Sequence, residues 1–251
     1  MCLILTAWDA HPEYQLVVAA NRDEFFARES APMAWWEDQP ILAGRDLSVP
    51  NGGTWLALAR TGRFAAVTNV RDFERQVPGA RTRGQLPVRY VVGDDSPGAY
   101  LHSIEGEHFN GYNLLVSDLN ELWWASNWWG EPTKLDSGIY GLSNAALDTP
   151  WPKVTEGKRM FTDALEADDV EAFFASLAND TQAPDDQLPD TGIPLELERL
   201  ASSAFIVSPD YGTNASTLLR VRHDGTFDVE ERRFAVGQET GRVRFEGRVP
   251  A

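Results

Sequence analysis

The residues best suited to chemistry lie at the start of the chain. Cys2 directly follows Met1 and is the only cysteine among the 251 residues. Because residue 2 is small, we expect removal of the methionine, which leaves a cysteine with both a thiol and a free α-amine. Such an amine has an ordinary pKa of about 7.7–8.0 and can accept the thiol proton near neutral pH. The start of the chain therefore predicts a nucleophile that contains its own base.

The tetrapeptide Asn21-Arg22-Asp23-Glu24 supplies the groups that would activate this nucleophile. An arginine near the thiol favours the thiolate electrostatically, and this is the role we expect for Arg22. A carboxylate can hold the amine by a charge-assisted hydrogen bond, which is the role expected of Asp23. Side chains alternate faces along a strand, so both can face Cys2 only where the strand ends or bulges. The other two members of the tetrapeptide are alternatives for the same roles.

A hairpin is the element that must bring these groups together. Residues 3–8 and 14–20 are short apolar runs separated by a polar turn, which is typical of two antiparallel strands. With the turn centred near His11, paired residue numbers sum to about 22, so that Cys2 lies opposite about Ala20. The tetrapeptide then lies at the thiol end of the sheet. The alternative interpretation is a small apolar cysteine that opens a buried strand.

Further motifs extend over most of the chain, and the block from residue 144 to residue 153 is the most specific of them. The motifs are Gly44-Arg45-Asp46, Asn51-Gly52-Gly53-Thr54-Trp55, Thr68-Asn69-Val70-Arg71, Ser143-Asn144-Ala145-Ala146-Leu147-Asp148-Thr149-Pro150-Trp151-Pro152-Lys153 and Tyr211-Gly212-Thr213. Together with the first two dozen residues they resemble the NRDE family, whose eukaryotic members are the transport and Golgi organization 2 proteins. That family in turn resembles the N-terminal-nucleophile hydrolases, especially the cysteine branch of bile-salt hydrolases and penicillin V acylases.

The resemblance implies a fold and a set of roles. The fold is α+β, a four-layer αββα sandwich of two antiparallel sheets with the nucleophile at the start of a central strand. Cys2 would attack an amide or related acyl carbon, with Arg22 and Asp23 beside it. Asn69 and Asn144 resemble the two asparagines that shape the oxyanion hole, where a preorganised donor is worth about 2.7–4 kcal/mol. Their alternative is a turn role, because asparagine tolerates unusual backbone angles.

Two departures leave a second hypothesis open. The arginine and aspartate are separated by two residues in the bile-salt hydrolases but are adjacent in this chain. NRDE sequences commonly have arginine after Tyr-Gly-Thr, whereas this chain has Asn214. The first hypothesis is a cysteine amidohydrolase acting on a small amide or acyl compound. The second is a non-catalytic protein of the same fold that binds or carries a hydrophobic ligand such as an acyl-CoA, a lipid or haem.

Composition limits the class of protein. The hydrophobic fraction of 43% is that of a globular chain, and we expect one domain over residues 1–251. No apolar run approaches 18 residues and residues 1–8 lack a basic leader, so we expect a soluble cytoplasmic protein without membrane insertion. A lone cysteine excludes an internal disulfide. No metal spacing, phosphate-binding glycine loop or Gly-x-Ser-x-Gly elbow occurs, and we expect no cofactor.

The charge of the chain is unusual. The net charge is −16, and only three of the 22 basic residues are lysines. An acidic, lysine-poor surface argues against nucleic acid and anionic membranes as partners. The partner that the resemblance implies is a small-molecule amide or acyl substrate. The acidic surface also suggests adaptation to high salt, because salt screens the self-repulsion of such a surface. We therefore expect a halophilic source, with an ordinary acidic protein as the alternative.

The remaining elements follow from periodicity and turn residues, and they occur as strands, then two helices, then strands. Hairpin-linked strands are predicted over residues 54–59, 63–68, 110–117, 121–127 and 138–142, and closing strands over residues 203–208, 217–222 and 226–234. Helical turns are predicted near residues 86–92 and 99–104, and helices over residues 153–165 and 170–177. We expect exposed or mobile segments at residues 71–84 and 179–195, and a poorly ordered tail after residue 235 that lasts until residues 243–245.

Overall fold

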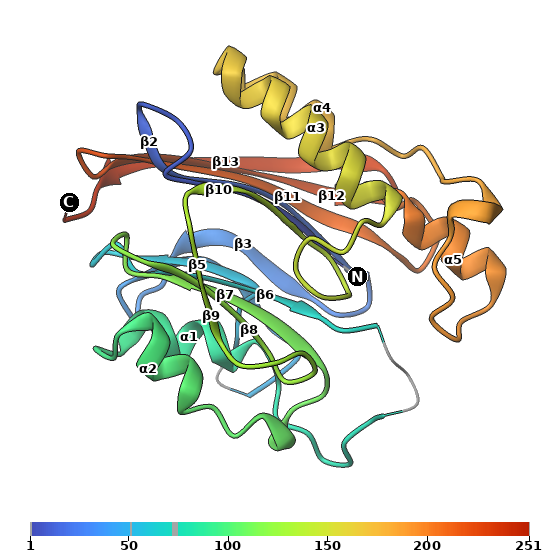
Figure 1. The fold of residues 1–251 in the computed structure, drawn as a ribbon, viewed down its shortest axis with the longest axis horizontal. Coiled ribbons are helices and arrows are strands. Elements are labelled where there is room, and N and C mark those ends of the chain that lie inside the picture. The colour runs from blue at the N-terminus through green and yellow to red at the C-terminus, as the bar shows by residue number, and fades with distance from the viewer. Residues whose placement is uncertain (1, 51, 72–74, 251) are drawn as a thin grey trace.

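The protein forms a four-layer sandwich in the computed structural model, which describes residues 2–50, 52–71 and 75–250 (Figure 1). Two antiparallel sheets stack face to face, and helices cover the outer face of each sheet. This confirms the predicted α+β class. The expected loss of Met1 lies outside the described residues, as does Asn51 of the predicted glycine turn.

The six-stranded sheet places the first strand of the chain in its interior, next to the edge strand. Its order is β10-β1-β2-β11-β12-β13, with every neighbouring pair antiparallel. The predicted hairpin forms β1 and β2, and each of these strands is flanked by a segment from far along the chain. The strands are β1 (Cys2–Trp8), β2 (Tyr14–Phe25), β10 (Gly138–Leu142), β11 (Tyr211–Arg222), β12 (Thr226–Ala235) and β13 (Gln238–Arg248).

The seven-stranded sheet has the order β3-β4-β5-β6-β7-β8-β9, so its strands follow the chain. The hairpins β5–β6 and β7–β8 confirm two of the predicted strand pairs. The strands are β3 (Ser30–Trp35), β4 (Ile41–Asp46), β5 (Leu56–Ala59), β6 (Phe64–Asn69), β7 (Tyr112–Ser117), β8 (Leu122–Ser126) and β9 (Thr133–Leu135).

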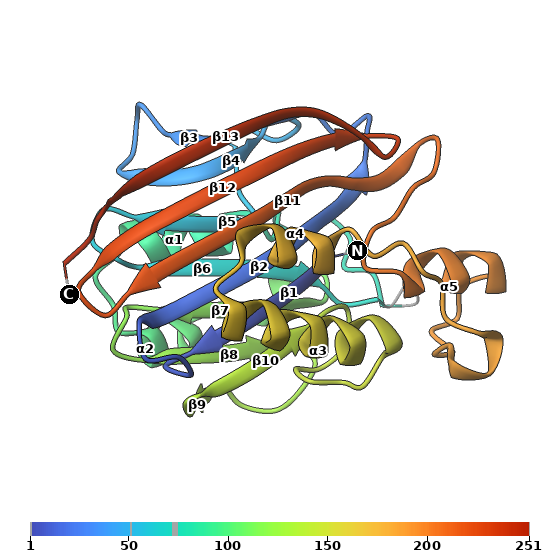
Figure 2. The ribbon, with the colours of Figure 1, turned by 90° about the horizontal axis from the view of Figure 1, so that it is seen from above.

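The helices lie in two outer layers and at one end of the sandwich. The pair α1 (Gln85–Val92) and α2 (Pro97–His102) covers the seven-stranded sheet, and the pair α3 (Pro152–Ala167) and α4 (Val170–Leu177) covers the six-stranded sheet (Figure 1). All four agree with the predicted helical segments. α5 (Leu195–Ser202) was not predicted, and it lies beyond the end of the sheets at which β1 begins (Figure 2).

Burial along β1 shows which side chains face the second sheet. Ile4 belongs to the core between the sheets, whereas Leu3 and Leu5 pack under α3 and α4. Because side chains alternate along a strand, Cys2 faces the same way as Ile4, toward the seven-stranded sheet. The fold therefore directs the thiol into the space between the two sheets.

Three local predictions were wrong. The hairpin register is shifted by two residues, because Trp8 pairs with Leu16 and centres the turn on residue 12. Residues 203–208 form no strand, and the sheet resumes only at Tyr211. The tail after residue 235 is β13, whose predominantly exposed side chains concealed its pairing with β12.

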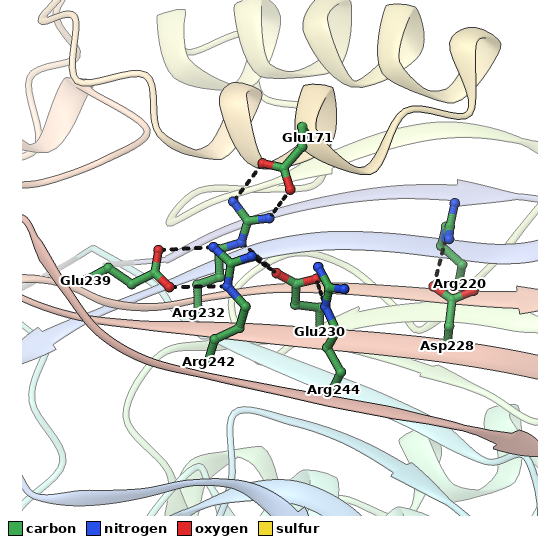
Figure 3. Close-up of polar contacts among 8 residues, drawn as sticks. All are labelled: Glu171, Arg220, Asp228, Glu230, Arg232, Glu239, Arg242 and Arg244. Atoms are coloured by element: carbon green, nitrogen blue, oxygen red, sulfur yellow. Dashed lines mark hydrogen bonds and ion pairs between the residues drawn. The ribbon is translucent and has the colours of Figure 1, made fainter.

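An ion-pair network lies on the outer face of β12 and β13, beside α3 and α4 (Figure 3). Glu230, only 6% exposed, lies at the centre of this network and accepts contacts from Arg232, Arg242 and Arg244. The guanidinium of Arg232 also binds both oxygens of Glu171 on α4. These contacts attach the edge strand to β12 and the helical layer to the sheet.

Candidate functional site

Cys2 and Arg22 are directly opposite each other in the β1–β2 pair. Paired residues of antiparallel strands project on the same face, so both side chains enter the space between the sheets. Arg22 is 5% exposed, and its guanidinium lies 4.9 Å from the ring of Trp55 and 3.9 Å from the Glu24 carboxylate. Among the described residues, nothing hydrogen-bonds its Nη1 atom. A buried guanidinium with a spare donor beside a thiol is suited to binding a thiolate or an acyl oxygen.

Asp23 projects on the opposite face from Arg22, as strand alternation requires. Its Oδ1 accepts a 2.6 Å hydrogen bond from the hydroxyl of Thr213 on β11. Burial raises the pKa of this carboxyl, and positive charges that include Lys153 oppose the rise. The expected bulge does occur at this level of the sheet, but it lies in β11 around Asn214 and not in β2. Asp23 is therefore placed toward the backbone end of Cys2, where the α-amine would be, and Arg22 toward the thiol.

The two alternatives in the tetrapeptide have other contacts. Asn21 donates to the carbonyl oxygens of Leu177 and Ala204, both at 2.8 Å, and accepts from Ser216. Both amide hydrogens of Asn21 and its side-chain oxygen are thus used in hydrogen bonds on the helix-covered face. Its role is therefore to join β2 to the helical layer. Glu24 lies on the thiol side of the strand, 3.3 Å from the guanidinium of Arg28.

Asn69 and Asn144 meet although they come from different sheets. Asn69 ends β6, and Asn144 follows β10. The amide nitrogen of Asn144 donates to the backbone oxygen and to the side-chain oxygen of Asn69, at 3.0 Å each. Asn69 lines the cavity that Cys2 opens into, whereas Asn144 is 1% exposed behind it. Asn69 therefore presents its amide to the cavity, and Asn144 orients it.

The cavity between the sheet ends has a volume of about 710 Å³, a size typical of small-molecule sites. Cys2, Arg22, Asp23 and Asn69 all line it, so four of the five predicted site residues share one space. Its wall is polar near the thiol and apolar toward α5. The other lining residues include Phe25, Arg28, Asp46, Thr54, Trp55, Arg81, Thr82, Arg83, Asn110, Ile193, Leu197, Leu200 and Tyr211.

Arg83 is a cavity residue that the sequence did not single out. It precedes Gly84, the N-cap residue of α1, and its Nη1 donates to the backbone oxygen of Gly111 at 2.9 Å. Burial lowers its pKa, and attraction to Cys2 is the largest effect that opposes this shift. Arg22 and Arg83 therefore place two positive charges near the thiol. The signal available in the sequence was the arginine-rich loop at residues 71–84, of which residues 72–74 lie outside the described residues.

Asn214, which stands where NRDE sequences commonly have arginine, lies in the bulge of β11. Asn214 is 6% exposed, and its Oδ1 accepts no hydrogen bond from the described part of the chain. Two buried cations, Lys153 and Arg71, interact electrostatically with Asp23. Arg71 donates a 2.6 Å bond to Glu198 of α5. Lys153 and Arg71 thus supply positive charge near Asp23, although residue 214 is not the arginine that the NRDE family commonly has there.

Comparison with known proteins identifies the family of this chain. Residues 1–236 match the family described as Transport and Golgi organisation 2. The chain belongs to this family. Its relatives include the Transport and Golgi organization protein 2 homologs of Bos taurus and Homo sapiens, which are 35% and 34% identical over 256 residues and are matched over 92% of both chains. The predicted NRDE family is confirmed.

A solved structure shares the fold of this chain. It is the C2A mutant of the conjugated bile acid hydrolase from Clostridium perfringens, with a TM-score of 0.56 over 98% of this chain and 92% of that one. At 8% identity the likeness concerns the fold alone. It agrees with the N-terminal-nucleophile sandwich that the sequence predicted.

The described residues contain neither a candidate metal cluster nor a candidate membrane-spanning helix. Among them, no three His, Cys, Asp or Glu side chains gather in a way that could hold a metal ion. No helix in the same part of the chain is long and apolar enough to cross a membrane.

Proposed function

We propose that this protein is a cytoplasmic cysteine N-terminal-nucleophile amidohydrolase that cleaves a non-peptide C–N bond in a small acyl compound. The observation that carries the proposal is the convergence of Cys2, Arg22 and Asn69 on one cavity. The fold shared with a conjugated bile acid hydrolase supports it. A nucleophile, a cation and a neutral amide donor around one space are the parts that acyl transfer needs.

The proposed reaction begins after removal of Met1. The α-amine of Cys2 takes the thiol proton, with Asp23 holding the resulting ammonium and Arg22 stabilising the thiolate. The sulfur attacks the acyl carbon, and the oxyanion is stabilised by the amide of Asn69. Collapse of the tetrahedral intermediate breaks the C–N bond, and the ammonium returns its proton to the leaving nitrogen. Water, deprotonated by the same amine, then hydrolyses the thioester and frees the thiol.

The second candidate is a binding protein for a hydrophobic ligand, and the apolar mouth of the cavity favours it. Phe25 is 57% exposed and Leu197 is 47% exposed, and both line the cavity together with Ile193 and Leu200. Exposed apolar side chains at a cavity mouth are typical of ligand-binding sites. The same surface would bind the acyl part of a substrate. The second candidate therefore differs from the first only in that the bound molecule is not cleaved.

The first test is the intact mass of the untagged protein before and after brief alkylation at pH 7. We expect loss of Met1 and alkylation of Cys2 much faster than that of a model cysteine. Retention of Met1, or an unreactive thiol, contradicts the hydrolase. A reactive thiol is followed by a screen of small amides with the Cys2→Ala variant as control. Hydrolysis should vanish in that variant, whereas binding of a hydrophobic ligand should survive under the second candidate.

A further inference from the structure

Lys153 is a buried cation beside the proposed nucleophile that the proposed reaction does not use. It is 4% exposed, and among the residues that the structure describes nothing hydrogen-bonds its Nζ atom. Lysine is almost never fully buried without a partner. By contrast, the other two lysines have direct carboxylate partners, Lys134 with Glu121 and Lys158 with Asp148.

The local structure also disfavours a cation at this position. α3 begins at Pro152, which places Lys153 in its first turn. A helix N-terminus carries partial positive charge, so an ammonium there is repelled. Burial and the helix dipole therefore both disfavour the charged form of Lys153. Residues that violate local rules in this way are expected mainly at functional sites.

The charges that face Lys153 come from four segments. They are Asp23 of β2, Cys2 of β1, Arg71 after β6 and Glu198 of α5. Glu198 is already occupied, because one oxygen accepts from Arg71 at 2.6 Å and the other accepts from the segment just before α5. Arg71 repels Lys153. Two attractive groups remain, the Asp23 carboxylate and Cys2, and Asp23 exerts the stronger attraction on Lys153.

We propose that Lys153 is a positioning residue of the nucleophile: its buried ammonium keeps the Asp23 carboxylate ionised, so that this carboxylate can hold the α-amine of Cys2. The inference rests on the proposed function, because it assigns Asp23 to the amine. Without the ammonium, a carboxyl in this buried place would take up a proton and lose its charge-assisted hydrogen bond. Lys153 would then act through Asp23 without touching the substrate.

The charge states of the pair are consistent with this role. Burial raises the pKa of Asp23, and Lys153 is among the groups that hold it down. Burial lowers the pKa of Lys153 to about 8, with attraction from Asp23 opposing the shift. At pH 7 the ammonium therefore predominates, and it is lost as the pH rises above 8.

The test is the pH profile of Cys2 alkylation by iodoacetamide, measured from pH 5 to 10 on the full chain without Met1. Cys2 is the only thiol, so the reaction reports on it alone. We expect Lys153→Met to lower the rate at pH 7 by about tenfold and to move the profile to higher pH. Lys153→Arg keeps the charge and should retain most of the wild-type rate. Lys158→Met, on the same helix, is the matched control and should alkylate like the wild type.

The outcomes separate this inference from the proposed function. A wild-type thiol no faster than a model cysteine refutes the activated nucleophile itself. A fast wild-type thiol with an unchanged pH profile in Lys153→Met refutes only the positioning role of Lys153 and leaves the activated nucleophile in place. A Lys153→Arg variant as impaired as Lys153→Met also overturns the proposal, because shape and not charge would then matter. If Lys153→Met does not fold, Lys153→Gln removes the charge while keeping a polar end and is judged by the same criteria.

Discussion

Asn144 donates its side-chain amide to both oxygens of Asn69, at 3.0 Å each. The two asparagines are thus not equivalent, although both were predicted to serve an oxyanion hole. The donors of Asn144 are used up inside the protein. Within the described residues, by contrast, the amide nitrogen of Asn69 makes only a long 3.4 Å contact with the backbone oxygen of Val70. We infer that Asn69 is the oxyanion donor and that Asn144 fixes its orientation.

This difference predicts distinct effects of the two alanine variants. Asn69→Ala should lower kcat on the amide found by screening by about 10²–10³-fold with little change in KM, because a transition-state donor is lost. Asn144→Ala should also slow turnover, and it should destabilise the fold by about 1–3 kcal/mol, because buried acceptors lose their donor. Urea unfolding measures the second effect, and Asn120→Ala in an exposed turn is the control. Undiminished kcat in Asn69→Ala would contradict the assignment.

Arg83 should contribute to thiol reactivity through its charge. Arg83→Gln removes a cation that is attracted to Cys2, so we expect the alkylation rate of Cys2 at pH 7 to fall by about tenfold. The difference from the wild type should shrink at 1 M salt, because part of the interaction is screened. Arg89→Gln, at an exposed position of α1, should alkylate at the wild-type rate. Equal rates for all three proteins would remove Arg83 from the site.

The local pattern of the sequence predicted the elements that carry the site better than it predicted their assembly. The β1–β2 hairpin and the start of α3 follow from apolar runs, turn residues and a proline at the first helical position. The register failed by two residues because His11 is not the centre of the turn. That shift matters, since it places Arg22 directly opposite Cys2.

The long-range part of the site has no local signal. Pairing of β10 with β1 brings Asn144 near the thiol, and pairing of β11 with β2 brings Thr213 to Asp23. The family resemblance pointed to Asn144, but nothing in the sequence showed that it lies behind Asn69. Lys153 was equally hidden, because a lysine in a first helical turn is expected to be exposed and not buried under the sheet.

The net charge of −16 predicts how stability depends on salt. Screening of self-repulsion should raise Tm between 0.1 M and 2 M potassium chloride, which is what a halophilic source requires. Exposed ion pairs weaken over the same range, but each is worth only about 0–1 kcal/mol. The network around Glu230 is buried at its centre and should be screened less. Scanning calorimetry at pH 7.5 measures the shift, and a constant or falling Tm would leave the ordinary acidic protein as the better hypothesis.

Glu231 should make stability depend on pH in the opposite direction to an ordinary paired carboxylate. It is fully buried on β12, with Met33 donating to Oε1 at 2.8 Å and Arg233 lying 3.8 Å away. Burial raises its pKa above the ordinary 4.5, which these donors only partly oppose. The folded state thus binds an extra proton, so the contribution of Glu231 to stability is complete below pH 4.5 and is lost as the pH rises through the raised pKa.

Glu231→Gln removes this titration. Between pH 4.5 and the raised pKa, the stability of the variant relative to the wild type should increase by up to about 1.4 kcal/mol per pH unit. Urea unfolding at pH 5, 6, 7 and 8 measures the difference, and its slope is the informative quantity, because the new amide alters hydrogen bonding by a constant amount. Glu246→Gln on exposed β13 should give a flat difference. A flat difference for Glu231→Gln as well would mean that this carboxylate is ionised across the whole range, held by Arg22 and Arg233 more strongly than burial opposes it.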